Sequence, residues 1–302
     1  KQKRSGILNA TYTADRERKN GMIRTIQTDE ITKNIKEMCI EANLHLSEDM
    51  EQAIRTAKEN EKGTLGKQIL GQLCENMDIA ANEQIPICQD TGMAVFFVKV
   101  GQDLHIEGMN ITEAINEGVR QGYTEGYLRK SVVADPLLRE NTKDNTPAII
   151  HYDIVPGDSL EILVAPKGFG SENMSRVFML KPADGAEGVK NAVIEAVKDA
   201  GPNACPPIVV GVGIGGDFEK AAILAKKALT RNTTEGSSLP HIRQMEQELL
   251  QTINQLGIGP GGLGGSTTAL AVNIETYPTH IAGLPVAVNM CCHVNRHVKR
   301  VL

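Results

Sequence analysis

Residues 203–216, NACPPIVVGVGIGG, decide the fold because they join a proline-containing turn, an apolar strand and the start of a helix. An unbroken apolar run rich in valine and isoleucine is typical of a strand that is buried on both faces. Helical patterns lie on either side of it, at about 185–199 and 217–230, and a third follows at about 238–255. Strands that alternate with helices in this way predict an α/β fold.

Further strands and helices are predicted outward from this stretch. Residues 112–133 show a helical pattern, and so does the N-terminal part of the chain, where Ile31, Ile35 and Met38 recur at three- and four-residue steps. The remaining strands are expected within residues 93–100, 147–158, 160–170, 257–276 and 284–290. We therefore expect a helical N-terminal lobe followed by a mixed-sheet α/β region.

The composition of the chain changes in two places. Residues 1–21 are polar and basic without a sustained period, so we interpret them as a flexible extension without a function. Residues 22–84 form the predicted helical lobe, and residues 85–302 form the predicted α/β region that carries the functional motifs. We expect residues 22–302 to fold as one compact unit.

Composition excludes several classes of partner. Aromatic residues make up only 3% of the chain and the net charge is -5, which disfavours stacking on nucleic acid and binding to a phosphate backbone. No apolar run approaches the roughly 20 residues that span a membrane, and no signal-peptide pattern opens the chain. The sequence therefore predicts a cytoplasmic protein that binds neither nucleic acid nor membranes.

Three of the six cysteines share a local setting. Cys88 in PICQDTG, Cys205 in NACPP and Cys292 in CCHVNRH each stand where an apolar stretch meets a polar turn, a usual place for functional groups. They are separated by 117 and 87 residues, so no short metal-binding motif applies. On the residues alone, each is a buried apolar residue, a metal ligand or a reactive thiol.

Glycine-rich stretches give a second signal. Gly211, Gly213 and Gly216 have the G-x-G-x-x-G spacing of a dinucleotide-binding turn, after a strand and before a helix. Neither a second strand nor a suitably placed acidic residue follows, because Glu235 lies in a polar loop. The run GIGPGGLGGST at 257–267 is either an anion-binding loop or a flexible surface loop.

Polar residues beside these motifs are candidates for substrate contacts. Gln89 and Asp90 directly follow Cys88, Arg129 lies near a predicted helix end, and His280 precedes an apolar strand. A guanidinium can hold a carboxylate through two parallel hydrogen bonds. Taken singly, a solvated arginine and a hydrogen-bonded loop histidine are the ordinary alternatives.

Together, IPICQDTG, KGFGSENMS, NACPPIVVGVGIGG and the segment 257–297 resemble the class I, iron–sulfur fumarate hydratases. The resemblance covers residues from about 25 to 302 and is closest to the separate α subunit of the two-subunit type. The same family includes the L-tartrate dehydratase α subunit. This resemblance implies a hydro-lyase that interconverts (S)-malate and fumarate, a reaction of the tricarboxylic acid cycle, with tartrate as the alternative substrate.

The resemblance also implies a cofactor and its ligands. It places a [4Fe–4S] cluster on Cys88, Cys205 and Cys292, with Cys291 as a buried neighbour. Three thiolates for four irons leave one iron with an open position, which can act as a Lewis acid on a substrate hydroxyl and carboxylate.

The remaining expectations concern the substrate and the partner. By resemblance, Gln89, Arg129 and Gly170 bind the substrate, while Asp90 and His280 handle protons or orient the hydroxyl. The catalytic base of such enzymes belongs to a part that a β subunit would supply, which implies an α2β2 heterotetramer. Two other functions stay open from the sequence: a nucleotide-binding α/β protein, and a non-catalytic iron–sulfur scaffold or sensor.

Overall fold

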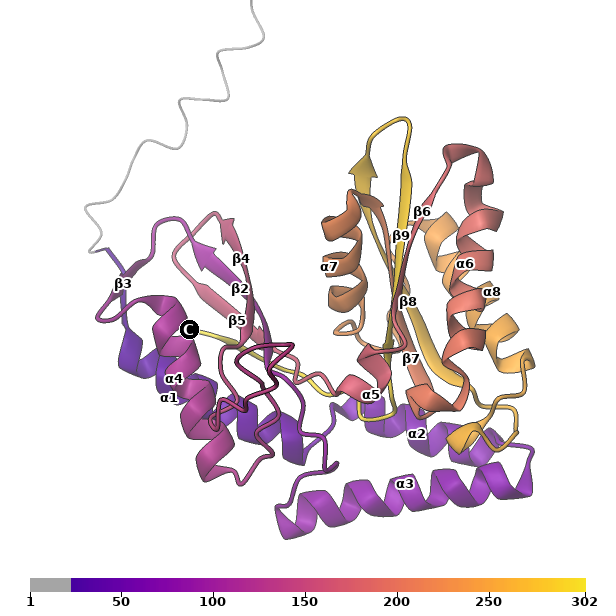
Figure 1. The fold of residues 1–302 in the computed structure, drawn as a ribbon, viewed down its shortest axis with the longest axis horizontal. Coiled ribbons are helices and arrows are strands. Elements are labelled where there is room, and N and C mark those ends of the chain that lie inside the picture. Colours follow the sequence, from indigo (N-terminus) through magenta and orange to yellow (C-terminus); the bar gives the residue numbers. More distant parts are fainter. Residues whose placement is uncertain (1–22) are drawn as a thin grey trace, which may run out of the picture.

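The computed structural model of the chain describes residues 23–302, so the extension predicted for residues 1–21 lies outside the described residues. Two four-stranded sheets, each covered by helices, form two halves that stand side by side (Figure 1). Two short parallel strands, β1 (Thr25–Gln27) and β3 (His105–Glu107), border the first half. Parallel and antiparallel pairs occur in both large sheets, which confirms the predicted α/β fold with mixed sheets.

The first half is built on the sheet β10-β5-β2-β4. Its strands are β2 (Val95–Gly101), β4 (Ile149–Val155), β5 (Leu160–Val164) and β10 (Val298–Val301). Helices α1 (Thr28–Leu44) and α4 (Ile111–Glu125) pack against the sheet through a core that includes Phe96, Val98 and Tyr123. Burial of these large side chains stabilises the half, because each removes apolar surface from water.

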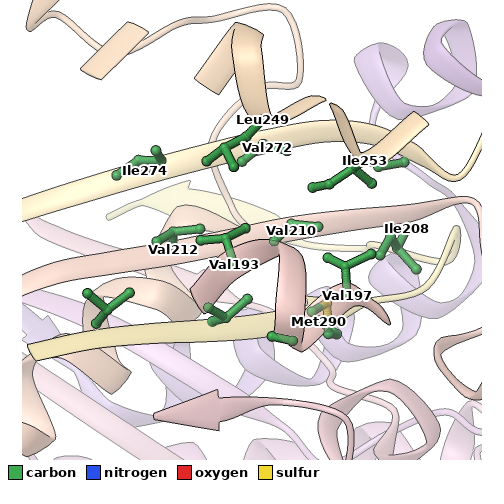
Figure 2. Close-up of a cluster of buried hydrophobic side chains, with 14 of the residues drawn as sticks. Val193, Val197, Ile208, Val210, Val212, Leu249, Ile253, Val272, Ile274 and Met290 are labelled. Atoms are coloured by element: carbon green, nitrogen blue, oxygen red, sulfur yellow. The ribbon is translucent and has the colours of Figure 1, made fainter. Parts of the chain in front are cut away.

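The second half is built on the sheet β6-β9-β7-β8. Its strands are β6 (Arg176–Leu180), β7 (Ile208–Gly216), β8 (Ala269–Thr279) and β9 (Leu284–Cys291). Helices α6 (Gly185–Ala200) and α8 (Pro240–Gln255) lie on one side of the sheet, and α7 (Phe218–Ala228) lies on the other (Figure 1). Figure 2 shows the core under α6 and α8, where valines of β7 meet Val193, Val197, Leu249 and Ile253.

The N-terminal helices are shared between the two halves. The helical prediction for residues 28–77 is confirmed by α1, α2 (Glu48–Asn60) and α3 (Thr64–Glu83). However, α2 and α3 lie beneath the second sheet, where Met50, Ile54 and Leu70 pack with Val209 and Ala271 (Figure 1). The division of the chain at residue 84 stays a prediction, and the packing joins these helices to both sheets.

The chain crosses between the halves several times. The crossing segments that matter for the site are 84–94 between α3 and β2, 165–175 between β5 and β6, and 292–297 between β9 and β10. The short helix α5 (Phe169–Glu172) lies in the second of these crossings, between the halves (Figure 1). Within residues 23–302, no helix is both long and apolar enough to cross a membrane.

The G-x-G-x-x-G pattern has a packing role in this fold. Gly211 and Gly213 lie inside β7, where α7 approaches so closely that an added Cβ would meet the carbonyl oxygens of Ala225 and Ala221 at 2.1 and 2.0 Å. The first N–H groups of α7 face Asp217, whose carboxylate accepts a hydrogen bond from the backbone of Lys220 at 2.9 Å. An acidic cap at this helix end disfavours a phosphate. These glycines therefore do not form the dinucleotide-binding turn that the spacing alone suggested.

Candidate functional site

Cys205 and Cys292 lie at the same edge of the second sheet. Val209 of β7 pairs with Cys291 of β9, so the segment that enters β7 and the segment that leaves β9 are neighbours. Cys88 and Cys292 pack against one shared buried cluster beneath that edge. Cys205 is exposed, but the partial burial of its thiol raises its pKa, and the nearby thiols of Cys292 and Cys88 raise it further. The fold therefore brings together three cysteines that are distant in sequence.

The Cys205 turn is held from two sides. Cys205 has a φ of 54°, in the left-handed region, directly after the 3₁₀ turn Gly201–Ala204. The backbone N–H of Gly261 donates to the carbonyl of Pro206 at 2.8 Å, which attaches the glycine-rich run to this turn. The ring Nδ1 of His293 lies 3.3 Å from the carbonyl oxygen of Cys205. These contacts fix an exposed thiol at the surface of the second half.

The two adjacent cysteines have different surroundings. Cys291 ends β9 and is buried, whereas Cys292 begins the crossing to β10 and is half-buried. A hydrogen bond between the two thiols lowers the pKa of Cys291 to about 6 and raises the pKa of Cys292. The buried position of Cys291 agrees with the sequence-based expectation that Cys291 is a packed neighbour of the third motif.

The Cys88 loop is held by buried donors. Tyr123 is fully buried, and its hydroxyl donates to the carbonyl oxygens of Thr91 and Gly92, both at 3.0 Å. The Thr91 hydroxyl donates to the carbonyl of Arg129 at 3.1 Å, so the segment after α4 lies beside the loop. Arg129 itself is exposed. The structure thus brings Arg129 to the Cys88 loop with its guanidinium open to solvent.

Asp90 joins the Cys88 loop to α5. Its carboxylate accepts hydrogen bonds from the backbone N–H groups of Phe169 at 2.9 Å and Gly92 at 3.1 Å. A Cβ at Gly168 would lie 3.1 Å from this carboxylate, so the approach is close. Gly170 is the next residue along after Phe169, and nothing lies within 4 Å of the position of its absent Cβ. Asp90 and Gly170 are therefore neighbours at an open surface.

A set of paired charged residues lies around the last residue of α5: Lys167 is buried, and Glu172 and Lys226 are half-buried. Lys167 is 5% exposed, and its ammonium lies 3.2 Å from the carboxylate of Glu172. Glu172 also pairs with Lys226 and accepts a hydrogen bond from Asn289 at 2.8 Å. Burial alone would raise the pKa of Glu172, but the ammonium groups of Lys167 and Lys226 outweigh it and lower the pKa. Two cations with one carboxylate make this region positively charged.

Arg296 is a second buried cation, which the sequence did not reveal. It is 3% exposed, and one end of its guanidinium donates to the carbonyl oxygen of Asp90. Its Nε and Nη1 atoms are buried without a hydrogen-bond acceptor among the described residues. Sequence offers little signal for such a residue, since an arginine in a polar turn is usually solvated.

His280 and Gln89 are not held in the same way. Gln89 is exposed next to Cys88, with its side chain open to solvent. His280 lies at the turn between β8 and β9, where its Nδ1 accepts a hydrogen bond from the Ala282 N–H at 3.2 Å. Eight residues of β9 separate this turn from Cys292, which corresponds to about 25 Å of extended strand. Figure 1 shows the turn at the opposite end of the second half from α5. Within one chain, His280 therefore lies far from the cysteines.

No group of three His, Cys, Asp or Glu side chains among residues 23–302 is arranged to hold a single metal ion. A cluster site differs from such a site, because each cysteine binds a different iron atom.

Comparison with known proteins places this arrangement in a family. The family model described as fumarate hydratase (Fumerase) matches residues 32–301. A Methanocaldococcus jannaschii protein provisionally named L(+)-tartrate dehydratase subunit alpha is 45% identical over 278 residues, which cover 90% of this chain and 97% of that protein. The L(+)-tartrate dehydratase subunit alpha of Escherichia coli strain K12 is 33% identical over 255 residues, covering 83% of this chain and 84% of the relative.

The chain belongs to the fumarate hydratase family and is a hydro-lyase. This confirms the resemblance of the sequence to class I fumarate hydratases and to the tartrate dehydratase α subunits of the same family.

Proposed function

We propose that the chain is the α subunit of an iron–sulfur hydro-lyase, with a [4Fe–4S] cluster on Cys88, Cys205 and Cys292. The observation that carries this proposal is the meeting of three cysteines from separate segments at one edge of the second sheet. Soft thiolate ligands suit iron–sulfur clusters. The unpartnered nitrogens of Arg296, whose guanidinium contacts the Cys88 loop, suit an anionic group in the same place. The residues present therefore fit the cofactor.

The residues around the cysteines have distinct proposed roles. When bound, a cluster with one iron free of protein ligands supplies a Lewis acid for the substrate's hydroxyl and carboxylate. The exposed guanidinium of Arg129 binds a carboxylate, while the open surface at Gly170 lets the substrate approach the backbone. Asp90, whose carboxylate is held by two backbone N–H groups, orients the substrate hydroxyl and exchanges a proton with it. Gln89 provides a further polar contact.

We propose (S)-malate and fumarate as the substrate pair. Removal of water from malate takes a proton from C3 and expels the C2 hydroxyl, so negative charge develops beside a carboxylate and fixed cations stabilise it. L(+)-tartrate is the second candidate, and the names of the relatives favour it. Tartrate has one hydroxyl group more than malate, so the contacts that the site makes to this second hydroxyl decide between the two substrates.

A β subunit is part of this proposal. The relatives are named as α subunits, and we propose that a β subunit provides the catalytic base in an α2β2 assembly. His280 would enter a neighbouring site only through a second chain, because it lies at the far end of β9 from the cysteines of its own chain. Its exposure at the turn is compatible with such a contact.

The direct test is the activity of the anaerobically reconstituted α–β complex on malate, fumarate and L(+)-tartrate. We expect the highest kcat/KM for the malate–fumarate pair and a loss of roughly 10²–10⁴-fold in Asp90→Asn. Lys67→Gln, a change on the exposed face of α3, serves as the matched control and should leave activity unchanged. Preference for tartrate would select the second candidate, and a cluster-loaded complex inactive on all three substrates would contradict the proposal.

A further inference from the structure

Arg296 is the buried cation with the least complete set of partners in the described part of the chain. Only Nη2 is hydrogen bonded, to the carbonyl oxygen of Asp90, while Nε and Nη1 have no acceptor. No carboxylate forms an ion pair with Arg296 among residues 23–302, and the Asp90 carboxylate is already bound to two backbone N–H groups. An unpaired charge away from water is strongly unfavourable, so the arrangement calls for an anionic acceptor.

The position of Arg296 points to the identity of that acceptor. It lies four residues after Cys292, and its hydrogen bond reaches the residue two places after Cys88. Its guanidinium therefore joins the loops of two of the three clustered cysteines. The unpartnered nitrogens do not reach any described sulfur or oxygen atom, so their acceptor is a group that the site receives.

We propose that Arg296 is the positioning and charge-balancing residue of the cysteine site, and that its Nε and Nη1 groups donate hydrogen bonds to the iron–sulfur group. This inference rests on the proposed function. Three thiolates around a dicationic [4Fe–4S] core leave a net negative charge, which a buried guanidinium balances. Hydrogen bonds and charge around a cluster also set its reduction potential and its retention.

The test compares Arg296→Gln and Arg296→Lys with Arg300→Gln. Arg300 is the matched control, because this arginine four residues further on pairs with Glu37 and Glu41 of α1 and not with the cysteine loops. All four proteins are reconstituted anaerobically, and iron loss to a chelator is followed with time. We expect about 10–100-fold faster loss in Arg296→Gln, a smaller change in Arg296→Lys, and the parent rate in Arg300→Gln.

A redox titration gives a second readout that folding alone does not move. Loss of a nearby positive charge stabilises the more oxidised cluster, so the midpoint potential should fall in Arg296→Gln and stay nearly unchanged in Arg296→Lys. Circular dichroism shows whether iron-free Arg296→Gln folds. If it does not, iron loss and midpoint potential of Arg296→Lys decide the question, because lysine keeps the positive charge and lacks the several N–H groups of the guanidinium. Its iron loss should then exceed that of the parent at an unchanged potential.

Three results would overturn the inference. The first is a cluster in Arg296→Gln that loses iron at the parent's rate and has the parent's midpoint potential. Where only Arg296→Lys folds, the same result in that variant counts. The second is unchanged retention together with a raised KM for the dicarboxylate when the variant is assayed in the α–β complex, which would assign the free nitrogens to a substrate carboxylate. The third is a parent that takes up no iron, which would remove the proposed function itself. The first two results leave the proposed function intact, so the failures are distinguishable.

Discussion

Replacement of Gly213 by alanine tests whether the glycines of β7 serve helix packing. Gly213 is buried, and α7 crosses over it. A Cβ at this position would lie 2.0 Å from the carbonyl oxygen of Ala221 and 2.7 Å from the backbone nitrogen of Ala225. Both atoms belong to the helix backbone, so rotation of a side chain cannot relieve the clash.

The size of the effect follows from this geometry. Ordinary contact begins at 3.4 Å, so the added Cβ and the carbonyl oxygen of Ala221 must move apart by about 1.4 Å. Helix α7 must therefore move away from the sheet. This movement loosens its packed face, where Ala221, Ala225 and Ala287 form a small buried cluster. Overpacking of a core costs about 1–3 kcal/mol, and a displaced backbone belongs at the upper end, so we expect a loss of about 3 kcal/mol.

Urea unfolding followed by circular dichroism measures this loss. Gly71→Ala is the matched control, because Gly71 lies inside α3 and an added Cβ would meet only the end of the Lys58 side chain at 3.7 Å. Alanine is the better helix former, so this control should gain about 0.5–1 kcal/mol. Equal stability of Gly213→Ala and the parent would refute the packing argument, and weaker NADH binding in Gly213→Ala at unchanged stability would restore the dinucleotide interpretation.

Three further predictions concern buried polar groups. Hydrogen bonds from Ser266 and Gly63 outweigh burial and hold the pKa of Glu61 at about 2, below its ordinary 4.5. The stabilisation that the Glu61 carboxylate provides is therefore complete above pH 4.5 and is lost as pH falls towards 2. The free energy of unfolding of Glu61→Gln should be about 2 kcal/mol lower than that of the parent at pH 7, and the difference should shrink in acid. Glu246→Ala should lose about 3 kcal/mol in urea unfolding, because it removes a buried carboxylate from Arg231; a loss below 1 kcal/mol would contradict this. Tyr123→Phe should cost about 1–3 kcal/mol and speed iron loss, since two carbonyls of the Cys88 loop lose their donor; unchanged iron retention would argue against a role for this anchor.

Local sequence patterns predicted most of the regular structure. The apolar run before Gly211 begins β7, which continues through the glycines to Gly216, and the segment in which Ile31, Ile35 and Met38 recur at three- and four-residue steps lies in α1. Four short strands were missed. β1 and β3 have three residues each, and β10 has four, so they give too few alternations to recognise; β6 is an edge strand. The assignment of α1 to one sheet and of α2 and α3 to the other was also not predictable, because periodicity shows which face is apolar and not what covers it.

The site was predictable only where a residue's role is local. Separations of 117 and 87 residues do not encode a shared site, so the resemblance, and not the spacing, grouped the three cysteines. Burial of Arg296 and the pairing of Glu172 with Lys167 and Lys226 depend on tertiary packing that a single sequence does not express. The distance of His280 from the cysteines follows from the order of residues along the chain. The strand predicted at 284–290 lies between His280 and Cys291 and therefore places them at opposite strand ends.

The most direct test of the cluster site is iron and sulfide per chain after anaerobic reconstitution of the parent and four single Cys→Ser variants. We expect about four of each in the parent. The cluster should be lost in Cys88→Ser, Cys205→Ser and Cys292→Ser and retained in Cys291→Ser, because Cys291 is buried at the end of β9. Absence of iron and sulfide from the parent, or full loading of any of the first three variants, would contradict the proposed cluster site.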